Sequence, residues 1–122
     1  MRHLALFLIP ALALPACFTT PEPKLSPQEQ QAFAAALTRM CDVDRQAGLS
    51  EGAEPLALGP KRTAWITEHV PNPEVIELRV LMSVKGAPEQ ATMLRERARD
   101  LGVKDCALAE SLAKTGEGGL SP

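Results

Sequence analysis

The sequence predicts an all-α fold, a small antiparallel bundle of about five short helices joined by one disulfide. Three observations lead to this prediction. Apolar residues recur at spacings of three and four in several segments, helix start and stop residues divide the chain into short pieces, and no pair of strands is evident. At 122 residues the chain has room for one domain, which we place at residues 26–115.

The first helix is expected to begin directly after Ser26. A proline follows it and Glu29 stands three positions on, which is the pattern of a capping box with proline at the first helical position. Apolar residues then repeat along one face as far as Ala47, and Gly48 ends the helix. The segment that follows, residues 50–59, is too rich in Gly, Pro and small residues to be assigned an element.

A second helix is predicted over residues 60–70, and Pro71 ends it.

The carboxylate of Asp44 is expected to need a partner of opposite charge. Asp44 lies near the end of the first helix, where its charge opposes the helix dipole. We therefore expect an ion pair with a neighbouring cation such as Arg45 or Lys61.

The third helix is expected to start at Asn72, which has Pro next and an acid in the first turn. It runs to Lys85 and is apolar on most sides, so we expect it to be the most buried element. A strand over residues 80–84 is the alternative. We prefer the helix because no partner strand is evident elsewhere in the chain.

Two more helices complete the predicted bundle. A fourth opens at Pro88 and ends at Gly102, with alanines and leucines at helical spacing between them. Asp105 is expected to cap a last helix that runs through Lys114. Residues 116–122, with the sequence GEGGLSP, are expected to form a flexible tail.

The N-terminus is typical of an export signal. One firm positive charge, on Arg2, precedes the apolar run LALFLIPALAL over residues 4–14. A membrane-spanning helix needs about 20 apolar residues, so this run is too short to be a stable anchor. The apolar core of an export signal has roughly 7 to 15 residues, and the run falls in that range.

Leu14-Pro15-Ala16-Cys17 resembles the lipobox of bacterial lipoproteins, although Pro15 replaces the small or β-branched residue usual there. The resemblance, which covers residues 1–17 only, implies that residues 1–16 are removed as a signal peptide. It also implies that Cys17 is lipidated and becomes the mature N-terminus.

In that class an Asp after the lipidated cysteine retains the protein at the inner membrane, and Phe18 stands there instead. The resemblance therefore implies an exported protein anchored to the outer membrane of the cell envelope. Residues 17–25 would be the lipidated Cys and a Pro-rich tether. The alternative is ordinary cleavage and a soluble secreted protein. That alternative leaves Cys17 as a free thiol in an oxidising compartment, which lipidation would cap.

The other two cysteines, Cys41 and Cys106, are expected to form a disulfide because the protein is exported to an oxidising compartment. The alternative is a redox dithiol. Catalytic pairs usually have the spacing C-x-x-C, and these two residues stand 65 positions apart. A bridge would join the first and last helices, and by the loop-entropy estimate could contribute roughly 4 kcal/mol to stability.

The sequence contains no recognisable catalytic, metal-binding or cofactor-binding constellation. His69 is the one histidine of the mature chain, so it cannot supply a zinc ligand set. Trp65 is expected to anchor the core, and becomes a binding contact if it is exposed. Arg95 and Arg99 share one helix face, which is either solvated surface with weak ion pairs or a contact for anionic lipid or glycan.

The formal net charge is −2 and no basic stripe with interleaved aromatics is present, which argues against nucleic acid as a partner. By elimination, we expect a lipid-anchored, non-catalytic protein-binding or accessory module of the cell envelope, with another envelope protein as its partner. The alternative is a small envelope enzyme or ligand carrier whose site assembles from His69, Glu68 and Asp42. An exposed apolar patch around Trp65 or residues 56–58 would favour the first, and His69 with an acid in a cavity would favour the second.

Overall fold

A computed structural model of the protein describes residues 24–49, 54–116 and 118–121. Within these residues all regular structure is helical, and a disulfide joins Cys41 to Cys106, so the predicted all-α bundle with one disulfide is confirmed. The signal segment and Cys17 lie outside the described residues, as does most of the tether. The helices are α1 (Pro27–Cys41), α2 (Val43–Gln46), α3 (Pro55–His69), α4 (Pro73–Ser83), α5 (Ala87–Asp100) and α6 (Ala107–Thr115).

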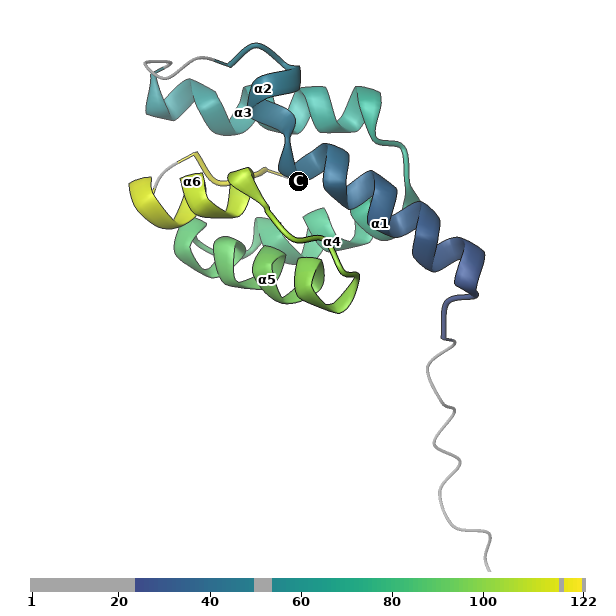
Figure 1. Ribbon diagram of the computed structural model, residues 1–122. Helices are drawn as coiled ribbons and strands as arrows, with labels where there is room; N and C mark the ends of the chain where they lie inside the picture. Colours follow the sequence, from purple (N-terminus) through teal and green to yellow (C-terminus); the bar gives the residue numbers. More distant parts are fainter. Residues whose placement is uncertain (1–23, 50–53, 117, 122) are drawn as a thin grey trace, which may run out of the picture.

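The helices form two groups on either side of the core (Figure 1). α2 and α3 lie together on one side, α4, α5 and α6 lie on the other, and α1 crosses beside both groups. α5 and α6 run side by side, and α1 packs on α4 and α6. The core is aliphatic apart from one aromatic ring. Its fully buried members include Leu37, Met40, Val43, Ile66, Val75, Met82, Leu94 and Leu112.

The predicted start of α1 is confirmed in atomic detail. The Glu29 amide donates to Ser26 Oγ at 3.2 Å, and the Ser26 amide donates to Glu29 Oε2 at 2.7 Å. This reciprocal pair satisfies two N–H groups that the first turn would otherwise leave open. Asn72 caps α4 with a single side-chain bond, since its Oδ1 accepts from the Val75 amide at 3.1 Å.

The expected end of the first helix was wrong, because α1 stops at Cys41 and the chain turns at Asp42 before the four-residue α2. Asp42 leaves the helical conformation at φ −102° and ψ 17°. The turn buries the side chain of Val43 completely and brings Asp44 beside α3. If α1 continued without the turn at Asp42, Val43 and Asp44 would not reach these positions.

The second predicted helix begins earlier than expected, at Pro55, which occupies the first helical position and loses no hydrogen bond there. Pro60 lies inside α3 and does not start it. α5 starts within one residue of the expected site. The N-cap of α6 is Cys106, which forms the disulfide with Cys41, and not the expected Asp105.

The expectation that α4 is the most buried element was wrong. One face of α4 packs inward through Val75, Leu78, Arg79 and Met82. The rest of the helix carries large apolar side chains that remain exposed. No helix of the described residues is long and apolar enough to span a bilayer.

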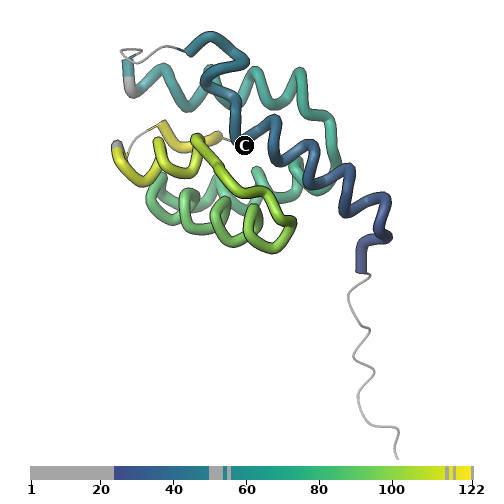
Figure 2. Tube along the Cα trace, in the orientation of Figure 1, coloured from purple at the N-terminus to yellow at the C-terminus, as the bar shows by residue number. Residues whose placement is uncertain are grey.

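We expected a flexible tail over residues 116–122, and the described part of it instead packs against the domain. Residues 118–121 run between α3 on one side and α5 and α6 on the other (Figure 2). Leu120 is buried, and its amide and carbonyl both bond the Gln90 side chain, at 2.8 and 3.2 Å. The Ser121 amide donates to Thr63 Oγ1 at 3.0 Å. A single apolar residue with partners for its backbone is enough to anchor this segment.

Candidate functional site

The largest exposed apolar feature of the described residues lies on α4 and the residue that caps its end. We call it the α4 face. Three of its side chains recur every four residues and so form one row along the helix. All four members are between 49% and 80% exposed: Ile76, Val80, Leu81 and Val84. A contiguous row of this kind marks an interaction surface more often than an isolated exposed leucine does.

Arg79 lies beside the α4 face and has no partner. It is only 7% exposed, and its Nε atom is buried without a hydrogen-bond acceptor. No ion pair or hydrogen bond to Arg79 occurs among the described residues. Burial lowers the pKa of its guanidinium, because the charged form loses water without gaining a counter-charge.

Arg62 shows how the same fold treats a fully buried arginine. Its Nε and Nη2 atoms donate to the two carboxylate oxygens of Asp44, at 2.7 and 2.6 Å. Nη2 also donates to Ser111 Oγ at 2.8 Å, and Nη1 donates to the Gly118 carbonyl at 3.1 Å. The partner of Asp44 is thus Arg62 on α3. The expected pairing with Arg45 or Lys61 was wrong, since Arg45 pairs with Asp42.

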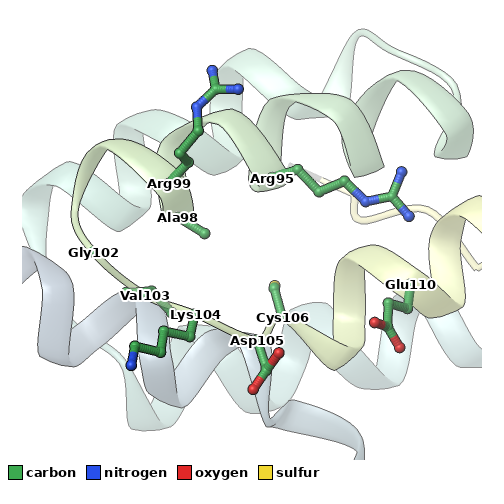
Figure 3. A pocket seen from close by; sticks show the side chains of 9 residues that line it. All are labelled: Arg95, Ala98, Arg99, Gly102, Val103, Lys104, Asp105, Cys106 and Glu110. Atoms are coloured by element: carbon green, nitrogen blue, oxygen red, sulfur yellow. The ribbon is translucent and has the colours of Figure 1, made fainter.

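A second feature is an open cleft of about 530 Å³ between α5 and α6. Figure 3 shows α5 as one wall and the loop leading into α6 as the other, with the chain turning between them at Gly102. Apolar atoms make up most of its surface, and Ala98, Val103 and the disulfide residue Cys106 contribute to it. The cleft is therefore shaped for a ligand with an apolar part.

Charged side chains of both signs surround this cleft. Arg95 and Arg99 project from α5, and neither forms an ion pair within the described residues. In Figure 3, Arg95 extends toward α6, where Glu110 lies, and Arg99 points away from the loop. Asp105 also lines the cleft, so an anion bound there would meet cations and carboxylates together.

Trp65 and His69 form a stacked pair at the end of α3. Their ring centroids are 4.6 Å apart and the planes differ by 12°. Trp65 is half-buried and packs against the core, and His69 is exposed with its Nδ1 atom 3.0 Å from the Trp65 carbonyl oxygen. The indole contributes to packing while one side of it is covered by the imidazole.

The structure does not bring together the residues of the alternative enzyme site. Asp42 bonds Arg45 and Gln46, whereas His69 contacts Trp65 one turn back on its own helix. The main clefts on the described residues are not lined by His69, Glu68 or Asp42. The described residues hold no group of three or more His, Cys, Asp or Glu side chains that could bind a metal ion.

The α4 face and Arg79 were not among the site residues expected from the sequence. The apolar residues on all sides of residues 73–85 were visible, but such a pattern fits a buried helix and an interface helix equally well. Arg79 stands within that apolar run, and its presence there could have distinguished an interface helix from a buried helix. A cation inside a fully buried helix would require a partner.

Comparison with known proteins gives no match, whether to a protein-family model, a curated protein or a solved structure.

Proposed function

We propose that this chain is a non-catalytic, lipid-anchored module that binds another protein of the cell envelope through the α4 face. The observation that carries the proposal is the row of large apolar side chains left exposed on one helix. Covering a half-exposed valine, leucine or isoleucine contributes roughly 1 kcal/mol each. Four such residues contribute roughly 4 kcal/mol together, so a specific complex needs further contacts from the partner around this apolar centre.

The anchor and the partner's location rest on the N-terminal sequence. Leu14-Pro15-Ala16-Cys17 supports lipidation of Cys17 after export, and the short Pro-rich segment behind it would keep the domain near a membrane surface. A partner that meets the α4 face would then be another envelope protein. Intact-mass analysis of the protein from native membranes tests the anchor, because lipidation predicts added acyl chains on residue 17. An unmodified cysteine at that position contradicts it.

Native complex size tests the binding surface. The protein, solubilised from its own membranes in mild detergent, should migrate in an assembly clearly larger than a single copy of the chain. Val80→Asp should return it to its free size, since a charge in the middle of the row blocks desolvation. Leu56→Asp is the matched control. Leu56 is 90% exposed on α3, but residues 57 and 58 are partly buried, so the structure shows a single exposed leucine there and not the apolar patch considered from the sequence. Identical migration of wild type and Val80→Asp contradicts the proposal.

A second candidate function is binding of a small amphiphilic anion in the cleft between α5 and α6. Its support is the mostly apolar surface of the cleft and Arg95, which extends toward α6. Calorimetry with laurate as the probe tests it, with Arg95→Gln as the variant and Arg99→Gln as the control, since Arg99 points away from the loop. Saturable binding that Arg95→Gln weakens and Arg99→Gln leaves unchanged would favour a ligand carrier, and no binding to the wild type would exclude this class of ligand.

A further inference from the structure

We infer that the protein partner covering the α4 face presents a carboxylate to Arg79, next to an apolar surface that packs on Ile76 and Val80. The inference rests on the proposed function and names the chemistry of its partner. Its basis is a buried cation that the fold leaves without a counter-charge, at the edge of an apolar row that the fold leaves uncovered.

The comparison with Arg62 shows that the missing partner is specific to Arg79. Both side chains are buried, yet Arg62 has a carboxylate, a hydroxyl and a backbone carbonyl as acceptors, whereas Arg79 has none in the described part of the chain. A buried charge without a partner is strongly unfavourable, and an apolar side chain in its place is often neutral or stabilising. Burial of Arg79 Nε therefore costs stability that no hydrogen bond within the described residues offsets.

Helix geometry places Arg79 at the boundary between the buried side of α4 and the row that a docked partner would cover. Arg79 follows Ile76 by three positions and precedes Val80 directly, so it lies along one flank of the row formed by Ile76, Val80 and Val84. A partner lying on that row would exclude water from the remaining exposed edge of the guanidinium. An acidic side chain could then form a short, charge-assisted pair with it, and such a pair adds orientation as well as affinity.

The flanking charges argue against an antiparallel second copy of this chain. Glu77 lies on the flank of the row opposite Arg79. Two α4 helices packed antiparallel about a two-fold axis would set equal flanks against each other, arginine near arginine and glutamate near glutamate. A parallel pair would set Glu77 of one copy beside Arg79 of the other, and crosslinking to a second copy is the result that would reveal it. An anionic membrane surface fits poorly as well, because exposed Glu77 borders the same row.

Site-specific photo-crosslinking in native membranes tests the inference. The full chain carries a photoreactive residue at Val80, and at Leu56 as the matched control on another exposed apolar site. We expect crosslinking from position 80, and not from position 56, to one protein, and the crosslinked peptide identified by mass spectrometry should contain Asp or Glu. Arg79→Met should lower the yield at least about tenfold, the loss expected when one member of a buried charge pair is removed. Arg79→Glu should be rescued by changing the mapped acid to arginine.

A stability measurement separates docking from a role in folding. Arg79→Met should leave the melting temperature of the purified chain unchanged or raise it, because it removes an unpaired buried charge. A lower melting temperature would assign Arg79 to the fold and overturn the inference.

The other outcomes distinguish the two proposals. If Arg79→Met does not change the yield of crosslinking to the partner protein, or if the crosslinked peptide contains no acid, this inference is overturned. The α4 face would still be supported as a docking surface. Crosslinking to lipid alone, or none at either position, overturns the proposed function itself. Crosslinking to a second copy of the chain overturns the assignment of the partner.

Discussion

The guanidinium of Arg62 bonds both carboxylate oxygens of Asp44, at 2.7 and 2.6 Å, and so ties α3 to α2 across 18 positions of sequence. The same side chain also bonds Ser111 on α6 and the backbone of residue 118. One fully buried arginine thus connects four segments of the chain. We regard it as the main polar contact between the two groups of helices.

Arg62→Met should therefore destabilise the fold by about 2–3 kcal/mol, a value below the usual cost of breaking a buried pair because Asp44 remains a third exposed. Urea unfolding measures the change. Arg45→Met is the control, because Arg45 forms its pair with Asp42 while 80% exposed, and its loss should change stability far less than the loss of Arg62. Equal effects of the two substitutions would contradict the structural role of Arg62.

The disulfide should contribute a large part of the stability. Cys41→Ser or Cys106→Ser removes a bridge between residues 65 positions apart and should cost about 2–5 kcal/mol. For a domain of this size each kcal/mol corresponds to roughly 4–8 °C in melting temperature, so calorimetry would resolve the loss easily. Unchanged melting in both variants would show that the bridge has no structural role.

Gly59→Ala tests whether residues 118–121 pack against α3. The expected change in stability is opposite in sign to the change that this substitution usually causes within a helix. Within a helix, Gly to Ala usually stabilises by up to about 1 kcal/mol. A Cβ atom at position 59, however, would lie 2.4 Å from the Gly119 carbonyl oxygen, so the substitution should destabilise the intact chain. In a chain ending at Gly116 the same substitution should stabilise. Stabilisation in both backgrounds would mean that residues 118–121 do not pack in solution.

The capping box of α1 should make stability depend on pH. The Ser26 amide, and then the Ser26 hydroxyl, lower the pKa of Glu29 below its ordinary 4.5. Because the folded pKa lies below the unfolded one, this contribution is complete above about pH 4.5 and is lost as the pH falls through the folded pKa. Glu29→Gln should thus be less stable than wild type near pH 6, and the difference should shrink on acidification. A difference that is constant with pH would exclude the carboxylate as its cause.

Local features of the fold could be predicted from the sequence because they depend on residues a few positions apart. The capping box at Ser26 needs only Glu29, and the cap at Asn72 needs only the amide of Val75. Gly48 and Gly102 both adopt positive φ, at 66° and 72°, where the sequence placed helix ends.

Features that depend on distant partners could not be predicted. Nothing near Asp44 indicates that its partner is Arg62, and nothing near Leu120 indicates that Gln90, 30 positions earlier, bonds its backbone. The candidate site was missed for a related reason. An apolar helix such as α4 shows in sequence that it avoids water, but not whether this chain or another covers it.

The most direct test of the α4 face as a docking surface is thiol labelling of Val80→Cys in intact native membranes and in the purified protein. Leu56→Cys serves as the control at an equally apolar, exposed position. We expect position 80 to be protected from maleimide in the membranes and to react after purification, while position 56 reacts in both. Equal reactivity of the two positions in native membranes would contradict it.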